Sequence, residues 1–112
     1  MSVDLTISFP GRETEFVSMC SQRTGEEWVG EIARKHGFRI LTGVYPTLIF
    51  ELADLNQVIL EVGILREEMF RLIKSDTRLS DFDKACNCDK WDRLLARLQQ
   101  LKLEMDWKAY FG

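Results

Sequence analysis

The sequence predicts an α+β or α/β fold, in which a small antiparallel sheet packs with two long C-terminal helices and one shorter N-terminal helix. Two observations carry this prediction. Apolar and polar residues alternate along residues 3–9, which is the period of a half-buried strand. After residue 54, apolar residues recur at intervals of three and four, which is the period of an amphipathic helix. A chain of 112 residues that is 46% apolar is typical of one domain, here 1–112.

The first strand covers residues 3–9, and Pro10-Gly11 ends it. Residues 12–20 fit either a second strand or the start of a helix, and both interpretations remain open. A helix is then predicted to begin at Thr24. Thr24 and Glu27 have the spacing of a capping box, in which two side chains satisfy free amides at a helix N-terminus.

Gly37 is the left-handed residue expected just after that helix, and three basic residues precede it, as the helix dipole favours. Residues 38–42 are predicted to form a strand, which the sequence Gly-Val-Tyr-Pro at 43–46 breaks. Residues 47–52 (TLIFEL) alternate like a strand. Because Pro46 could equally be the first residue of a short helix, strand and helix remain alternatives there.

Two long helices complete the predicted fold. The first spans about residues 55–74 and follows Asp54, which resembles a capping box together with Gln57. Residues 76–80 form a loop, and the second helix spans about Cys88–Trp107. The predicted apolar stripes are Leu55, Val58, Ile59, Val62, Leu65, Met69, Leu72 and Ile73 on the first helix, and Trp91, Leu94, Leu95, Leu98, Leu101 and Met105 on the second.

The stretch ACNCDKWD, which contains Cys86 and Cys88, is the part of the chain that most resembles a metal site. Structural zinc sites use four Cys or His ligands, usually in pairs two to four residues apart. These two cysteines are separated by one residue, and only Cys20 and His36 remain as partners. A calcium loop would require glycine where Cys86 stands. We therefore predict no metal and no cofactor, and we interpret Asn87 as the N-cap of the last helix.

No catalytic residue is predicted, and the chain is expected not to be an enzyme. Nucleophilic catalysis needs a nucleophile, a base and an orienting group, and His36 is the one histidine of the chain. Neither of the phosphate-binding patterns G-x-G-x-x-G and G-K-[ST] occurs. A small enzyme with a carboxylate or cysteine centre is kept as the third alternative.

Charge and hydropathy disfavour two classes of partner. The net charge is −3 and no dense run of Lys and Arg occurs, so DNA and RNA are not expected partners. No apolar run approaches the roughly 20 residues needed to span a bilayer, and no signal peptide is recognisable. These features predict no membrane association and a cytoplasmic location. The acidic balance favours a basic protein as the partner.

Candidate partner-binding residues lie on the first long helix, opposite its main stripe. Leu60 and Ile64 form an apolar pair at i, i+4, and such residues adjoin on a helix surface. Glu61, Glu67 and Glu68 are expected to form an acidic rim around them, which would steer a basic partner. A second core face is the alternative interpretation of the apolar pair.

Leu103 and Trp107 are predicted to form a similar pair on the last helix, with the same two interpretations, because a helix with two apolar sides lies between other elements or meets a partner. Arg66 falls inside the apolar stripe of the first long helix. It is expected either to snorkel or to pair with a carboxylate.

A family resemblance adds to this pattern. An N-terminal strand precedes an aromatic-Pro break, which is followed by TLIFEL and then by a charged amphipathic helix containing EVGILREEM at 61–69. Over about residues 3–75 this order resembles small bacterial immunity proteins, which neutralise toxins of contact-dependent or polymorphic systems. The matching positions are Tyr45, Pro46, Leu48, Leu52, Leu65, Arg66 and Glu68.

The resemblance implies a cytoplasmic α/β protein that binds and blocks one toxin, and it assigns no binding residue. The function expected first is therefore a non-enzymatic protein-binding domain of immunity type, with a basic toxin domain as its partner. The alternative is a homodimeric scaffold or regulatory adaptor that uses the spare helix faces.

Overall fold

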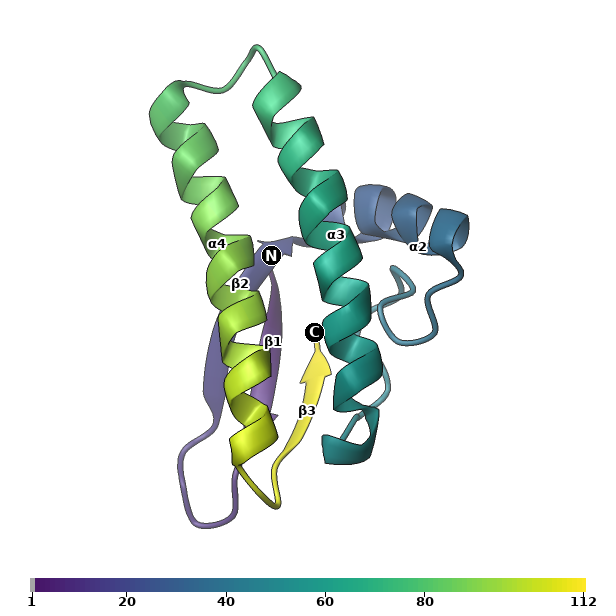
Figure 1. Cartoon of the computed structure of the whole chain (residues 1–112), viewed down its shortest axis with the longest axis vertical. Coiled ribbons are helices and arrows are strands. Elements are labelled where there is room, and N and C mark those ends of the chain that lie inside the picture. The colour runs from purple at the N-terminus through teal and green to yellow at the C-terminus, as the bar shows by residue number, and fades with distance from the viewer. Residues whose placement is uncertain (1) are drawn as a thin grey trace.

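A three-stranded antiparallel sheet lies behind two long helices, which confirms the predicted α+β class (Figure 1). The computed structural model describes residues 2–112. The elements in chain order are β1 (Ser2–Ser8), β2 (Glu15–Ser21), α1 (Gln22–Thr24), the π-helix η1 (Gly25–Val29), α2 (Gly30–His36), the 3-10 helix η2 (Leu52–Asp54), α3 (Leu55–Ser75), α4 (Asp81–Gln100), the 3-10 helix η3 (Leu101–Leu103) and β3 (Lys108–Phe111).

The sheet has the order β2-β1-β3, so the two ends of the chain lie in neighbouring strands. Leu5 of the central strand is paired with Val17 on one side and with Phe111 on the other. Because side chains alternate along a strand, Leu5 and Ile7 face the helices and are fully buried. The strand predicted in residues 3–9 is confirmed. Of the two alternatives for residues 12–20, the strand is correct, and it begins at Glu15.

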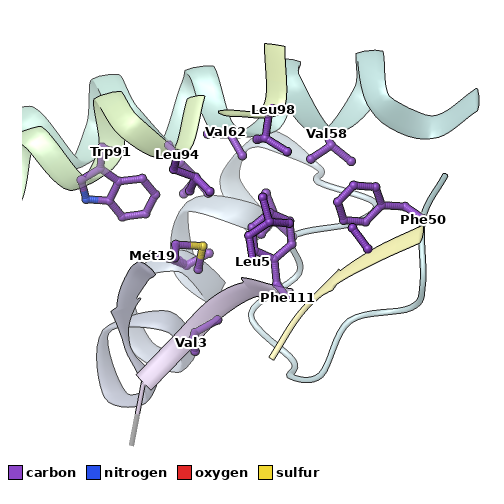
Figure 2. Close-up of a cluster of buried hydrophobic side chains, with 14 of the residues drawn as sticks. Val3, Leu5, Met19, Phe50, Val58, Val62, Trp91, Leu94, Leu98 and Phe111 are labelled. Atoms are coloured by element: carbon purple, nitrogen blue, oxygen red, sulfur yellow. The ribbon is translucent and has the colours of Figure 1, made fainter. Parts of the chain in front are cut away.

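The core fills the space between the sheet and the helices α3 and α4. Figure 2 shows side chains from both helices meeting those of β1, β2 and β3. Burying a side chain of this size stabilises the fold by about 1.5–3 kcal/mol. The buried residues that join these elements include Leu5, Met19, Phe50, Val58, Val62, Leu65, Trp91, Leu94, Leu98 and Phe111.

The helix α3 is the element that the sequence predicts best. It begins at Leu55 and ends at Ser75, against predicted bounds of 55–74. The loop 76–80 between α3 and α4 is also confirmed. Among residues 2–112, no helix combines the length and the apolar character that crossing a bilayer requires.

The first helical segment begins earlier than predicted. Ser21 is its N-cap, because the Ser21 hydroxyl accepts a hydrogen bond from the Thr24 N–H at 3.1 Å. The predicted capping box at Thr24 and Glu27 is therefore wrong, and both residues lie inside the segment. The predicted C-terminus is correct, since Gly37 has a φ of +68°.

The last helix also begins earlier than predicted, at Asp81 rather than near Cys88. Ser80 is the N-cap, and its hydroxyl accepts from the Asp83 N–H at 3.1 Å. The interpretation of Asn87 as an N-cap is wrong. It lies inside α4, where its side-chain amide donates to the Asp83 carbonyl at 2.8 Å.

The end of α4 differs from the prediction as well, because the helix stops at Gln100 and the chain returns as the strand β3. Asp106 has a φ of +62°, which turns the chain back toward the sheet. Trp107, predicted as the last helical residue, is buried in the core, and its indole N–H donates to the Leu101 carbonyl at 3.1 Å. It packs edge-on against Phe50, with 6.0 Å between the ring centroids.

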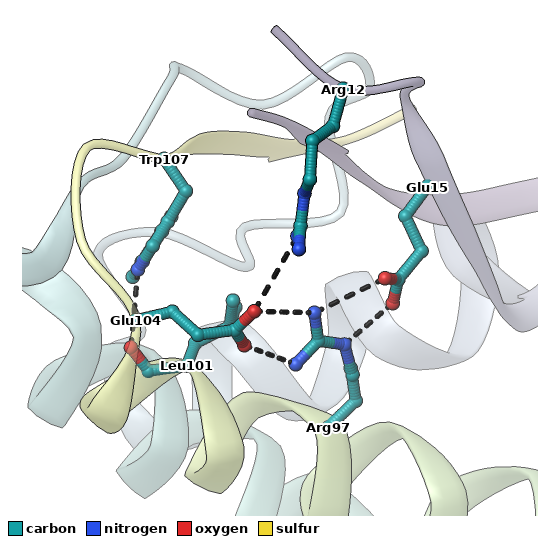
Figure 3. Close-up of polar contacts among 6 residues, drawn as sticks. All are labelled: Arg12, Glu15, Arg97, Leu101, Glu104 and Trp107. Carbon is teal, nitrogen blue, oxygen red and sulfur yellow. Dashed lines mark hydrogen bonds and ion pairs between the residues drawn. The ribbon is translucent and has the colours of Figure 1, made fainter. Parts of the chain in front are cut away.

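A partly buried ion cluster closes the end of the core nearest the β1–β2 turn (Figure 3). Arg97 of α4 donates to Glu15 of β2, with its Nε 2.5 Å from the carboxylate, and also to Glu104 beyond η3. Arg12 approaches Glu104 to 3.5 Å. The cluster therefore ties the last helix to the edge strand and to the segment that leads into β3.

Residues 38–42 do not form the predicted strand. The N–H groups of residues 39–41 donate to a side chain of α3 instead of to a neighbouring strand, as described below. Residues 47–52 do not form a continuous strand either, although Phe50 forms an isolated bridge to Ala109 of β3. Leu52 then begins the short helix η2.

Candidate protein-binding site

Exposed apolar side chains concentrate in the connection between α2 and α3, residues 38–54. Among residues 2–112, ten large apolar side chains are exposed. Four of them lie in this connection: Val44 (71% exposed), Leu48 (89%), Ile49 (65%) and Leu52 (46%). Folded chains usually bury such side chains, and a cluster of exposed ones is typical of an interaction site.

Three of these side chains line a hollow of about 390 Å³, here called the loop hollow. Val44, Leu48 and Ile49 contribute its apolar wall together with Pro46 and Phe50. Arg39 and Asp54 supply charged groups at its border. An apolar surface with a few charged groups beside it has the composition of a protein interface.

The N-terminal end of the connection is held by Glu61 of α3. This carboxylate is 1% exposed, and it accepts from the backbone N–H groups of Arg39, Ile40 and Leu41 at 3.0, 3.1 and 2.8 Å. The side-chain amide of Gln57 donates to it at 2.7 Å. Four donors compensate for the loss of water around the buried carboxylate. The connection is thereby fixed onto α3.

The C-terminal end of the connection is held by β3. Phe50 exchanges two backbone hydrogen bonds with Ala109, at 2.8 and 3.0 Å. The Thr47 N–H donates to the Phe111 carbonyl at 2.8 Å, and the Thr47 hydroxyl accepts from the Phe111 N–H at 2.9 Å. Leu48 and Ile49 therefore lie between two anchored residues.

The middle of the connection packs closely against the helical segment. Gly43 has a φ of +90°, and a Cβ atom on it would lie 2.4 Å from the Cα atom of Gly30 in α2. A side chain at Gly43 is thus excluded by both conformation and space. With both ends and the middle fixed, the exposed side chains are held in one arrangement before any partner binds.

The surface predicted on α3 is only partly present. Leu60 is exposed, whereas Ile64 is half-buried. The prediction of Glu61 as a rim residue is wrong, because its carboxylate points inward to the backbone of residues 39–41. The i, i+4 spacing correctly places Leu60 outside the main stripe.

Of the other two predicted rim residues, Glu67 is exposed and Glu68 is half-buried, and both form ion pairs. Glu67 lies 2.9 Å from Arg66. Glu68 lies 2.9 Å from Arg71 and 3.7 Å from Lys35. Although desolvation opposes the charged form, these two cations hold the pKa of Glu68 below its ordinary value. Their negative charge is therefore largely neutralised within the chain.

The predicted apolar pair on the last helix is wrong. Leu103 is 89% exposed, but Trp107 is buried on the far side of the turn that ends α4. Of the two interpretations of Arg66, pairing is confirmed, since its Nε lies 2.6 Å from Asp92 of α4. That contact joins the two long helices at the surface.

The three cysteines differ in their surroundings. Cys86 is exposed, whereas Cys20 and Cys88 are half-buried. Burial raises the pKa of the Cys20 thiol to about 12, against a weaker opposing effect of Lys90. The thiolate is the reactive form, so Cys20 is poorly suited to act as a nucleophile near neutral pH.

Alkylation at pH 8 is expected to distinguish these thiols. Iodoacetamide should modify Cys86 within minutes and leave Cys20 unmodified in the folded chain, because Cys20 is both shielded and protonated. Peptide mapping by mass spectrometry reports each site, and in denaturant all three cysteines should react. Equal rates at Cys20 and Cys86 in the folded chain would contradict the described environment.

Within residues 2–112, no group of three or more His, Cys, Asp or Glu side chains is placed to hold a metal ion. The absence of a bound metal stays a prediction for elemental analysis of the purified protein.

Comparisons with protein-family models, with curated proteins and with solved structures gave no match to this chain. The resemblance to immunity proteins therefore depends on the quoted sequence positions alone.

Proposed function

We propose that this chain is a non-enzymatic protein-binding domain of immunity type, which binds and neutralises a cognate bacterial toxin through the connection between α2 and α3. The observation that carries the proposal is the group of exposed apolar side chains on an anchored connection. Leu48 and Ile49 are held out toward solvent although both neighbours, Thr47 and Phe50, are bonded to β3.

The anchoring favours binding energetically. Ordering a flexible loop on association costs about 0.5–1.5 kcal/mol for each immobilised side chain, in addition to the backbone cost. Here Glu61 and the bonds to β3 hold the loop in the free chain. Apolar anchors near the centre of an interface typically contribute most of its binding energy.

The charges beside the loop hollow support a basic partner. Asp54 is exposed at its border and Glu51 is exposed next to it in the chain, and the side chain of each accepts a backbone N–H of the other across η2. Arg39 at the same border already donates to Gln57. Both carboxylates keep free lone pairs toward solvent. Together with the net charge of −3, they favour the approach of a positively charged protein surface.

The test uses, as the candidate toxin, the protein encoded by the reading frame next to the gene for this chain. Leu48→Asp and Ile49→Asp should each weaken the complex about 100-fold or more, roughly 2.7 kcal/mol, because a charge enters an apolar contact. Thermal unfolding should change little, since both side chains are exposed. Calorimetric titration and growth of cells that express the toxin measure the two consequences.

Leu103→Asp is the matched control, because Leu103 has the same exposure as Leu48 but lies beyond α4. It should bind and protect like the unmodified chain. Leu60→Asp tests the surface that the sequence predicts on α3. The proposal fails if the neighbouring product is not neutralised at all, or if Leu48→Asp and Ile49→Asp bind as tightly as the control.

A homodimeric scaffold is the second candidate function, and the edge strand β2 favours it. Residues 47–50 cover the outer edge of β3, whereas no backbone hydrogen bond within residues 2–112 covers the outer edge of β2. Phe16 on that strand is 65% exposed. An open edge pairs readily with a second strand. A constant monomer mass by light scattering over a wide concentration range would exclude this candidate.

A further inference from the structure

A second and larger hollow lies away from the connection between α2 and α3. It has a volume of about 630 Å³, within the range of about 300–1,000 Å³ typical of small-ligand sites. Figure 1 shows α3 and α4 continuing past the sheet toward the loop that joins them. This part of the two helices, the loop between them, the end of β2 and the segment α1–η1 line the hollow, which is open to solvent on one side, and we call it the hairpin hollow.

Its floor is apolar and aromatic. Met69, Ile73 and Trp91 line it from α3 and α4, and each is nearly fully buried. Trp28 lines it from the π-helix η1 and is 38% exposed. Short π-helical turns are rare and often occur at functional sites. A half-exposed indole in a hollow provides a flat surface on which an apolar group can pack.

Its mouth carries an excess of positive charge. Arg23, Arg78 and Lys90 reach it from α1, from the loop before α4 and from α4. Glu27 lies 3.4 Å from Arg23 and Asp76 lies 3.1 Å from Arg78, so both carboxylates are paired. No carboxylate of residues 2–112 forms an ion pair with Lys90.

This local excess is opposite in sign to the net charge of −3. Three cations and two anions at the mouth leave one positive charge without a partner, on Lys90. A ligand that matches the hollow therefore needs a single negative charge at one end. Polar side chains such as Ser21, Thr24 and Asn87 also line the hollow, whereas the floor formed by Met69, Ile73 and Trp91 suits an apolar body rather than a second charge.

We propose that the hairpin hollow binds a small amphipathic anion, with one carboxylate beside Lys90 and an apolar body packed against Trp28 and the floor. Lys90 donates hydrogen bonds to the carboxylate, and the paired arginines add to the attraction at the mouth. The proposal is independent of the toxin-binding surface, because the two hollows share no residue.

Two-dimensional NMR of the full chain provides the test, with decanoate and indole-3-acetate as probes and the matching neutral amides beside them. At least one of the two carboxylate probes, decanoate or indole-3-acetate, should shift the indole N–H signals of Trp28 and Trp91. Trp107 is an internal control, because its indole N–H is bonded to Leu101 beyond the other end of α4. The neutral amides should bind about ten-fold more weakly, since they lack the charge-assisted contact.

Two variants assign the charge effect to one side chain. Lys90→Met should remove the difference between acid and amide, whereas Lys102→Met in η3 should preserve it. Trp28→Ala should weaken acid and amide alike, because it removes packing rather than charge. The proposal is overturned if neither carboxylate shifts the two indole signals, if acid and amide bind equally, or if Lys90→Met binds the acid as the unmodified chain does.

Discussion

Replacing Glu61 by alanine is expected to lower the free energy of unfolding by about 3 kcal/mol or more. The reason is that three backbone N–H groups of residues 39–41 would lose their shared acceptor, and an unsatisfied buried donor costs about 1–3 kcal/mol. Glu61→Gln should have a smaller effect, because its one remaining oxygen can still accept from part of this set. Urea unfolding measures both variants.

The matched control is Glu67→Ala, six residues along the same helix. Glu67 is exposed, and its contact with Arg66 is an ordinary surface ion pair, so its loss should change stability by less than about 1 kcal/mol. A Glu61→Ala variant as stable as this control would show that the carboxylate does not anchor the connection. In that case the bonds of Thr47 and Phe50 to β3 would be the remaining anchors of Leu48 and Ile49.

Replacing Arg97 by methionine is the second large effect that we expect, about 2–3 kcal/mol of lost stability near pH 7. Methionine keeps much of the packing but leaves Glu15 without a cation, and Glu104 with only the more distant Arg12 at 3.5 Å (Figure 3). The loss is smaller than the 3–5 kcal/mol typical of fully buried pairs, because both carboxylates retain some contact with water.

The pH dependence of this effect has a definite sign. Hydrogen bonding from Arg97 holds the pKa of Glu104 below its ordinary value, although desolvation opposes it. A lowered folded-state pKa contributes stability that is present above the unfolded-state value, about 4.3, and is lost as pH falls through the folded value. In Arg97→Met the same protonation relieves repulsion, so the stability gap between the two proteins should narrow below about pH 4. A gap that widens on acidification would contradict the arrangement.

The sequence predicts those elements whose signal is local and long. The helix α3 has an apolar stripe that runs along about five turns, and its predicted bounds differ from the observed ones by one residue. The strand β1 alternates without interruption, and Gly37 ends α2 in the left-handed region as predicted. In these segments, pattern, capping and tertiary packing favour the same structure.

The errors occur where a tertiary contact or a competing cap decides the structure. Leu98, Leu101 and Met105 continue the helical spacing beyond Gln100, so the turn at Asp106 has no signal in the apolar pattern. At the start of α4, Ser80 caps the helix earlier than Asn87. Both residues are good N-caps, and sequence alone does not rank them.

The candidate site could not be read from the sequence for a related reason. The strand predicted in residues 38–42 is prevented by Glu61, which is about twenty residues away in the chain and takes up the backbone donors. In TLIFEL, Phe50 alone is buried, while Leu48 and Ile49 are exposed. Their hydrophobicity alone would predict burial. They stay exposed because Thr47 and Phe50, on either side of them, are bonded to β3. The run of three adjacent apolar residues at 48–50 is the one local sign in the sequence, because neighbouring side chains of an extended segment point to opposite sides and cannot all face one core.

Hydrogen exchange of the chain, alone and mixed with the proposed toxin partner, tests the central claim most directly. In the free chain the amides of Leu48 and Ile49 donate to no other group within residues 2–112, so they should exchange quickly. Binding through the connection between α2 and α3 should slow exchange in residues 42–52 and leave β2 and the exposed face of α4 unchanged. Protection confined to β2 or to α4, with residues 42–52 exchanging as fast as in the free chain, would contradict the account.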